Sequence, residues 1–245
     1  MMRFLVPGIN LSGETVQIPD DVCHHAFRVR RLALGMPFQI YNGTGFKATT
    51  VVHDWTYGPT IGTITSVEYV DTELKKPIRV AQGLPKNADR MEQVLQHGTE
   101  LGVAAFHVFA GERSVAKLDS KDKIDKRMDR WKMIIASAAE QSGRGFLPTV
   151  QWHHTVRTLP VSATEVLLVL HEGASLPLCE TLRSTSACES YMLVIGPEGG
   201  LSDSEISFCK KGNSTEVSLG PRILRTETAA LAAVAQLSYF LESNS

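Results

Sequence analysis

The sequence has no apolar run long enough to cross a membrane. The longest wholly apolar stretch is 229–235, whereas a membrane-spanning helix needs roughly 20 such residues. Residues 1–6 contain one arginine and are followed by Pro7 and Gly8, so they lack the basic start, long apolar centre and cleavage site of a secretory signal. We therefore expect a cytoplasmic protein with no membrane partner.

Cysteine is also scarce. The 245 residues include four cysteines, with no Cys-x-x-Cys pair and no matching pair of histidines for zinc. Neither a His-Glu-x-x-His motif nor a Ser-His-Asp pattern is visible. The sequence therefore predicts free thiols and no metal site.

An excess of charge of one sign is missing too. Lys and Arg number 25 against 26 Asp and Glu, and a net charge near zero gives no sign of a polyanion partner. The content of 43% hydrophobic and 21% charged residues is typical of a globular protein, and the length corresponds to one or two domains.

Residues 1–72 are predicted to form a small β-barrel. Asn42 and Gly43 predict a tight hairpin turn, because both residue types tolerate positive φ. A helix over 19–31 is expected, because Pro19 can begin it and two aspartates follow. The expected strands are rich in β-branched and aromatic residues and cover 38–42, 46–53 and 60–69.

The pattern changes after the polar segment 70–77. Strand-like and helix-like stretches then alternate, which is typical of an α/β domain with a largely parallel sheet. We therefore predict a second domain over 73–245. Its expected strands are 78–84, 106–109, 166–171, 192–195 and 216–219, and its expected helices are 87–101, 121–142, 176–184, 203–211 and 226–241.

A glycine-rich segment, Ile195-Gly-Pro-Glu-Gly-Gly-Leu-Ser202, follows one of these strands. Ser202 and Glu205 form a capping box that begins the next helix. Open α/β sheets bind ligands at the carboxyl ends of strands, and glycine lets the backbone approach a ligand closely. The segment is neither a dinucleotide-binding motif nor a P-loop, and a plain tight turn is the alternative interpretation.

A second Gly-Pro turn leads through Arg222 and Arg225 to Thr226, which is predicted to cap a long alanine-rich helix. Two guanidinium groups beside the positive end of a helix repel it, so we expect an anionic or electron-rich group between them. Solvated arginines, or ion pairs with Glu198 and Glu227, are the alternatives. The small residues of the helix allow either a dimer face or a core position.

Positive charge gathers in three further places. Within 112–132, Lys and Arg outnumber the acidic residues, which favours a salt-bridged solvated helix first and polyanion contact second. Gln141 and Arg144 follow at the end of that helix. The third place is the first domain, where the basic cluster is Arg28, Arg30 and Arg31.

Several motifs together carry a resemblance to a known family. They are His25-x-x-Arg28-Val with Arg31, Tyr41-Asn-Gly43, Arg90-Met-Glu-x-Val, Thr99-Glu-Leu-Gly-Val103, Gln141-Ser-Gly-Arg144 with Pro148, the segment Ile195–Ser202, and Leu219-Gly-Pro-Arg-Ile-Leu-Arg-Thr-Glu-Thr-Ala229. With them the chain resembles, over nearly its whole length, the RsmE-type family of SPOUT-class enzymes, which methylate N3 of a uridine in 16S ribosomal RNA. It departs from the family at Arg30, where leucine is usual, and at His97, where lysine is common.

The resemblance implies an N-terminal PUA-like RNA-binding barrel and a C-terminal SPOUT α/β domain with a deep trefoil knot. It also implies a homodimer, S-adenosylmethionine as methyl donor, and the assembled small ribosomal subunit as the RNA partner. The implied cofactor contacts are Leu170, His171, Glu172, Gly173, Ile195, Gly196, Pro197, Gly199, Gly200, Leu219, Gly220, Ile223, Leu224 and Thr226. The implied RNA contacts are Arg28, Arg31, Lys86, Arg90, Gln141, Arg144 and Arg222.

The chemistry of such a reaction needs no cysteine nucleophile, because N3 of uridine becomes nucleophilic once its proton leaves. An arginine near the base oxygens stabilises the resulting anion, in a contact worth roughly 3 to 4 kcal/mol. We expect Arg225 in this role, while Glu198 or Glu227 orients the arginines or removes the proton. The alternatives are methylation of a 2′-oxygen or another base nitrogen, and a ribosome-assembly protein that binds RNA without catalysis.

Overall fold

The computed structural model describes residues 1–55, 60–185, 188–210 and 212–244. The chain falls into two compact units, Met1–Glu73 with Ala139–Leu147, and Leu74–Ala138 with Pro148–Ser245. The sequence pattern assigned all residues after 72 to the second domain, whereas residues 139–147 group with the first unit. Residues 139–147 group with the first unit because of tertiary contacts, such as the hydrogen bond of 2.8 Å from the N–H of Gly45 to the carbonyl of Gly145.

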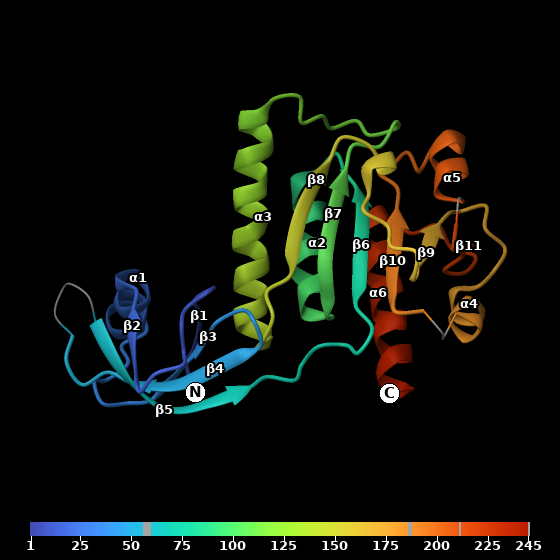
Figure 1. Ribbon diagram of the computed structural model, residues 1–245. Coiled ribbons are helices and arrows are strands. Elements are labelled where there is room, and N and C mark those ends of the chain that lie inside the picture. The colour runs from blue at the N-terminus through green and yellow to red at the C-terminus, as the bar shows by residue number, and fades with distance from the viewer. Residues whose placement is uncertain (56–59, 186–187, 211, 245) are drawn as a thin grey trace. The chain divides into compact units, whose positions relative to one another are not determined.

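A curled five-stranded sheet forms the frame of the first unit (Figure 1). Its order is β1-β3-β4-β5-β2, with β1 and β3 parallel and the other pairs antiparallel. The predicted strands β3 (Phe38–Tyr41), β4 (Phe46–Val51) and β5 (Thr60–Tyr69) are confirmed. The strands β1 (Arg3–Leu5) and β2 (Thr15–Ile18) were not predicted, because three or four residues are too few to show alternation.

The predicted turn between β3 and β4 is also confirmed. Gly43 and Gly45 have φ values of 72° and 101°, which few other residues adopt. The side chain of Asn42 accepts hydrogen bonds from the backbone N–H groups of Thr44 and Phe46 at 2.9 and 3.0 Å. The asparagine therefore fixes the turn through its side chain.

The predicted helix over 19–31 forms, but only its first turn is α-helical. After α1 (Asp20–Cys23), the chain continues as a π-helix, η1 (His24–Val29), and the Arg30 N–H donates to the His25 carbonyl over 2.8 Å. The turn ends at Arg31, whose φ of 55° is left-handed and uncommon outside glycine. Such wide turns are frequent at functional sites.

A six-stranded sheet forms the centre of the second unit. Its order is β11-β9-β10-β6-β7-β8 and every pair is parallel, which confirms the predicted parallel sheet. Only β8 was not predicted from the sequence. The strands are β6 (Ile78–Gly83), β7 (Val103–Phe109), β8 (Thr149–His153), β9 (Glu165–Leu170), β10 (Ser190–Ile195) and β11 (Ser214–Val217).

The strand order of this sheet reverses between β6 and β10. From β6 the chain proceeds outward to β7 and β8, and the later strands β10, β9 and β11 occupy the other half. At such a reversal the loops after the carboxyl ends of the strands diverge and leave room for a ligand. The fold therefore favours a site where β6 and β10 end.

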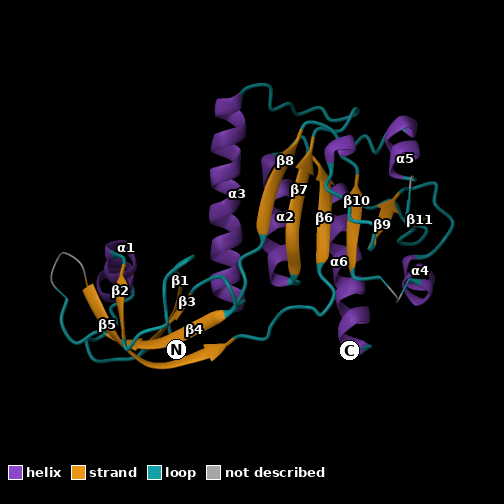
Figure 2. Cartoon of the chain, in the orientation of Figure 1, coloured by secondary structure: helices purple, strands orange, loops and turns teal. Residues whose placement is uncertain are grey.

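Helices cover both faces of the parallel sheet (Figure 2). On one face α2 (Ala88–Glu100) and α6 (Thr226–Ser243) pack against each other, α6 also packs against β6 and β10, and α4 (Leu178–Ser184) lies beside α6. On the other face α5 (Asp203–Cys209) and the 3₁₀ turn η2 (Val156–Thr158) cover an apolar cluster that includes Met192 and Val194.

The predicted helices of the second domain are all present. The helix α3 (Lys121–Ser142) has the predicted bounds and ends before Gly143, whose φ is 72°. The helix α4 begins two residues later than predicted, and α5 ends at Cys209, while the predicted last residue, Lys211, lies outside the described residues. No helix formed by the described residues is long and apolar enough to cross a membrane.

A series of polar contacts links side chains from four strands of the parallel sheet. Arg79 forms an ion pair with Glu165 at 3.0 Å, and its Nη2 lies 2.7 Å from Nε2 of His107. Nδ1 of His107 in turn lies 3.0 Å from Nε2 of His153. Burial, together with the charge of Arg79, lowers the pKa of His107 to about 3, so its ring is neutral and accepts a hydrogen bond from Arg79.

Candidate functional site

Three loops meet at the carboxyl edge of the parallel sheet. They follow β9, β10 and β11, which are neighbours and run in the same direction, so their ends lie at one edge. The loops contain residues 170–173, 196–200 and 218–225, which include most of the predicted cofactor contacts. The structure therefore brings together segments that are far apart in the sequence.

The loop after β10 leaves no room for side chains at two of its glycine positions. A Cβ on Gly196 would lie 2.7 Å from the backbone of Gly200 and Leu201, and one on Gly199 would lie 3.0 Å from Cβ of Arg113. The predicted capping box is confirmed, because Ser202 accepts from the Glu205 N–H at 3.1 Å and Glu205 accepts from the Ser202 N–H at 2.8 Å. The loop is thus compact and fixed at its end.

The buried residue Gln82, at the end of β6, fixes the other side of this loop. Its Nε2 donates to Oγ1 of Thr226 at 2.7 Å and lies 3.3 Å from the carbonyl of Gly196. Thr226 Oγ1 donates to the same carbonyl at 2.6 Å. The first residue of α6 is therefore tied to the loop after β10, and a single buried glutamine gave no pattern that could have predicted it.

Gly83, which follows Gln82, explains how closely β6 approaches this loop. A Cβ at Gly83 would lie 2.6 Å from both Cδ and N of Pro197, well inside the distance that heavy atoms tolerate. Gly111 lies against the same proline, because a Cβ at Gly111 would lie 3.2 Å from Cδ and Cγ of Pro197. These two glycines were also missed, because their role depends on a proline more than 80 residues away in the sequence.

The predicted cap of α6 was wrong. The N-cap residue is Arg225, in an extended conformation and with no side-chain cap hydrogen bond, and Thr226 is the first helical residue. Thr226 lies one position inside the helix, and its hydroxyl donates to the carbonyl of Gly196 and accepts from Nε2 of Gln82. It ties the helix to a neighbouring loop.

The loop after β11 is much more open. Arg222 and Arg225 are exposed, and the side chains of both make no hydrogen bond or ion pair with the residues that the structure describes. Ile223 between them is 78% exposed, and Gly220 has a φ of 108° and nothing within 4 Å of a Cβ position. The interpretation of solvated arginines therefore fits this structure.

The predicted ion pairs of these arginines with Glu198 and Glu227 do not form. Both carboxylates instead contact Arg90, with Nη1 2.9 Å from Oε1 of Glu198 and Nε 3.7 Å from Oε1 of Glu227. Glu198 also accepts the backbone N–H of Lys86 at 3.0 Å. Arg90, predicted to contact RNA, is therefore held by acidic groups at the start of α2.

The loop after β9 carries the remaining predicted cofactor contacts. Glu172 and Gly173 are exposed, whereas Leu170 and His171 are half-buried. Nδ1 of His171 lies 3.6 Å from Glu216, which also pairs with Lys210.

In the first unit, the basic cluster is only partly free. The guanidinium of Arg28 lies over the ring of Trp55, 5.5 Å from its centroid, and Arg30 donates from Nε to His25 at 3.3 Å. Arg28, Arg31 and Gln141 are exposed, which is consistent with the predicted RNA contacts. Arg144 is 4% exposed and forms an ion pair with Glu73, so the prediction that it contacts RNA does not fit this structure.

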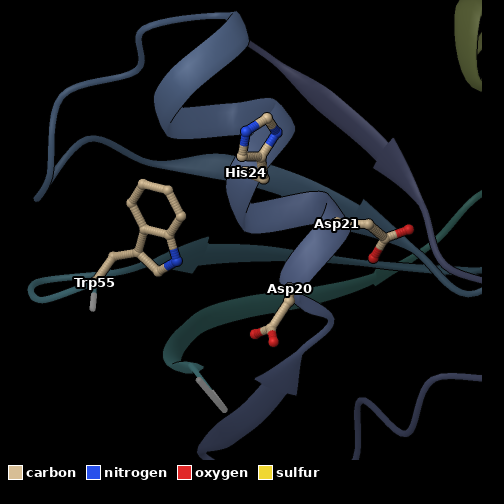
Figure 3. A pocket seen from close by; sticks show the side chains of 4 residues that line it. All are labelled: Asp20, Asp21, His24 and Trp55. Atoms are coloured by element: carbon tan, nitrogen blue, oxygen red, sulfur yellow. The ribbon is translucent and has the colours of Figure 1, made fainter. Parts of the chain in front are cut away.

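A hollow of about 390 Å³ lies beside α1 in the same unit (Figure 3). It is lined by Trp55, His24, Asp20 and Asp21. The carboxylates of Asp20 and Asp21 would repel phosphate groups. This hollow is therefore unsuited to the RNA backbone, and it lies in the unit that does not contain the three loops.

The described residues contain no group of three or more potential metal ligands. All four cysteines are free, and Cys23 and Cys209 are buried. Burial raises the pKa of Cys209 to about 11 and also raises that of Cys23, so both thiols stay protonated and unreactive near neutral pH.

Comparison with known proteins gives a consistent result. The profile of the RNA methyltransferase domain family matches residues 72–238. The chain belongs to this family. Ribosomal RNA small subunit methyltransferase E of Bacillus subtilis is 34% identical over 235 residues, which are 93% of this chain and 91% of that protein.

Two solved structures of methyltransferases are similar to the whole chain. Ribosomal RNA small subunit methyltransferase E from Neisseria gonorrhoeae, bound to S-adenosylmethionine, is 30% identical with a TM-score of 0.87 over 98% of both chains. A methyltransferase from Legionella pneumophila, in complex with the same cofactor, is 32% identical with a TM-score of 0.82 over 98% of this chain and 97% of that one. Within the family, this chain therefore has the fold of proteins that bind S-adenosylmethionine.

Proposed function

We propose that the protein methylates N3 of a uridine in the 16S RNA of the assembled small ribosomal subunit, with S-adenosylmethionine as methyl donor. The observation that carries the proposal is that the loops after β9, β10 and β11 lie at one edge of the sheet, next to the strand-order reversal and beside an exposed Arg225. Membership of the RNA methyltransferase family gives these loops their chemistry. Because the proposed substrate is the small ribosomal subunit, we also propose that the protein is cytoplasmic.

The residues of the loops fit S-adenosylmethionine, which supplies the methyl group when bound. A Cβ at Gly200 or Gly220 would meet nothing within 4 Å, so there is room beside these backbones. Ile223 and the half-buried Leu219 and Leu224 offer apolar surface, which suits an adenine ring. Ile195 is 3% exposed, so we propose that it contributes backbone groups and no apolar wall.

We assign Arg225 the role of stabilising the uridine anion. Its guanidinium is exposed and unpaired among the described residues, so no protein partner must be displaced before it meets a base oxygen. Glu198 and Glu227 hold Arg90 and do not orient Arg225. We assign RNA contacts to Arg28, Arg31, Lys86, Gln141 and Arg222, and omit Arg90 and Arg144 because acidic side chains hold them.

The proposed fold is a PUA-like barrel followed by a knotted SPOUT domain. The curled sheet of the first unit supports the barrel. In the second unit, α6 packs at the centre on β6 and β10 although the chain has just left the edge strand β11. This return of the chain from the edge of the sheet to its centre supports the proposed trefoil knot.

We also propose a homodimer formed through α6. Residues 228–241 of this helix contain no charged side chain, and Tyr239 is 73% exposed. An exposed apolar helix surface is typical of an interface between subunits. Sedimentation of the purified protein tests this, and a monomer at micromolar concentration would contradict it.

The function is tested by incubating the purified protein with labelled S-adenosylmethionine and small ribosomal subunits that lack the modification. The RNA is then digested and the labelled nucleoside identified by mass spectrometry. N3-methyluridine is the expected product. A 2′-O-methylated nucleoside or another methylated base would replace the proposed specificity, and bound cofactor without labelled RNA would favour a non-catalytic role.

A further inference from the structure

Arg90 occupies an unusual position for a residue expected to bind RNA. It lies in the first turn of α2, and its guanidinium contacts carboxylates from two other segments, Glu198 of the loop after β10 and Glu227 of α6. These contacts connect residues 108 and 137 positions apart in the sequence. The arrangement joins three of the elements that surround the proposed cofactor site.

Burial makes this arrangement energetically important. The side chain of Glu227 is 10% exposed and that of Arg90 is 29% exposed. Oε2 of Glu227 is buried and has no hydrogen-bond partner among the described residues, so Arg90 supplies the main compensation for this carboxylate. A buried carboxylate that loses its cation becomes strongly unfavourable.

Glu198 fixes the loop after β10 from outside. Both of its oxygens accept the N–H of Lys86, at 3.1 and 3.0 Å, and one also accepts from Arg90. On the inside, Gln82 and Thr226 hold the carbonyl of Gly196. The loop is thus held at Gly196 by Gln82 and Thr226 and at Glu198 by Lys86 and Arg90, and Arg90 adds a second connection to the first turn of α6 through Glu227.

We infer that Arg90 is a positioning residue, which sets the spacing between the Gly196–Gly200 loop and the start of α6 and thereby determines cofactor affinity. It does so without touching the RNA or the reacting atoms. The inference rests on the proposed function, because it takes this spacing to be the S-adenosylmethionine site. A guanidinium shared by two carboxylates has little charge left to offer a phosphate.

The test compares three variants with the wild type by calorimetry with S-adenosylmethionine and by binding of small-subunit RNA. For Arg90→Met we expect the Kd for the cofactor to rise about tenfold, while kcat at saturating cofactor stays within threefold. RNA affinity should stay within twofold and keep its salt dependence. A phosphate contact would instead lower the slope of log K against log salt by about one.

Two further variants separate positioning from general damage. Arg90→Lys should raise the Kd by less than threefold, since an ammonium can pair with one carboxylate but cannot bridge both as a fork does. Arg90→Met combined with Glu227→Gln should recover most of the lost affinity, because the uncompensated buried charge is gone. If Arg90→Met does not fold, Arg90→Lys and Glu227→Gln alone carry the same comparison.

The outcomes distinguish this inference from the proposed function. Unchanged cofactor affinity in Arg90→Met, or a weaker RNA complex with a lower salt slope, would overturn the inference only. A wild-type protein that binds the cofactor but yields no N3-methyluridine would overturn the proposed base specificity and leave the role of Arg90 intact. A wild-type protein that does not bind the cofactor would overturn both.

Discussion

The loops after β10 and β11 lie at the same edge of one sheet, yet they are built in opposite ways. The loop after β10 is tied by Gln82, Thr226 and Arg90 and is too crowded at Gly196 for a side chain. The loop after β11 carries two exposed arginines and an exposed isoleucine. The difference fits the proposed function, in which the tied loop contributes backbone groups to the cofactor site, while the open loop contributes apolar surface to that site and Arg225 to the substrate.

The largest effect is expected where the tied loop loses its close approach. Gly196→Ala places a Cβ 2.7 Å from backbone atoms, and it should lower the free energy of unfolding by about 3 kcal/mol. Gly200→Ala in the same loop is the matched control, because its φ is 71° but nothing lies within 4 Å. It should cost about 1 kcal/mol. Equal losses in urea unfolding would show that backbone conformation, not space, constrains the loop.

Substitutions in the loop after β11 should change the turnover of the enzyme and leave its free energy of unfolding nearly unchanged. Arg225→Ala is expected to lower kcat about 100-fold, because it removes a contact made to the developing anion, and to leave the Kd for cofactor within a few-fold. Steady-state methylation at saturating substrate measures kcat, and calorimetry measures the Kd for the cofactor. Arg222→Ala is the control and should act mainly on RNA affinity. Unchanged turnover would remove Arg225 from the mechanism.

Lowering the pH should weaken the contact between Arg79 and His107 and thereby destabilise the protein. The pKa of His107 is about 3 in the folded protein and near 6.5 when unfolded, so acid adds a proton to the unfolded state first. Stability is therefore lost as the pH falls from about 6.5 toward 3, by about 2 kcal/mol at pH 5. The pKa of His153 is also lowered and adds to the loss. Urea unfolding at pH 7 and 5 should show a smaller loss in His107→Gln, and equal losses would contradict the assignment.

The smallest effect on the protein itself is expected from the exposed basic cluster. Replacing Arg28 and Arg31 together should leave cofactor binding unchanged but weaken RNA binding and lower its salt slope by roughly two. Filter binding over a range of salt concentrations measures this. A double replacement of Lys121 and Lys123 in α3 is the control. If only the control lowers the slope, the RNA contacts α3.

The sequence predicted the long elements well because their patterns are local. The alternating residues of β5 and the apolar strand β10 are recognisable in themselves, whereas β1 and β2 become strands only through their neighbours. The glycine-rich segment at 196–200 was predicted as a ligand loop because glycines and a capping box are contiguous there. Its position beside α6 depends on Gln82, which no local pattern distinguishes.

The residues whose partners the sequence did not predict share one feature. Arg90 and Arg144 are free arginines as far as the sequence shows, and only the fold brings Glu198 and Glu73 to them from 108 and 71 positions away. The same holds for Thr226, whose hydroxyl is taken by a carbonyl 30 positions away. Whether a charged side chain serves the structure or a substrate is decided by such distant partners.

The reversal of strand order affects how this protein folds during its synthesis. During synthesis β6 leaves the ribosome early, but its central partner β10 follows more than a hundred residues later, since Val80 pairs with Leu193. Until then β6, β7 and β8 form at most a half-sheet with an unpaired inner edge, which invites pairing with other chains. Because the pairing of β6 with β10 joins residues so distant in sequence, folding should be slow. The nascent chain is therefore prone to aggregation until β10 has emerged from the ribosome.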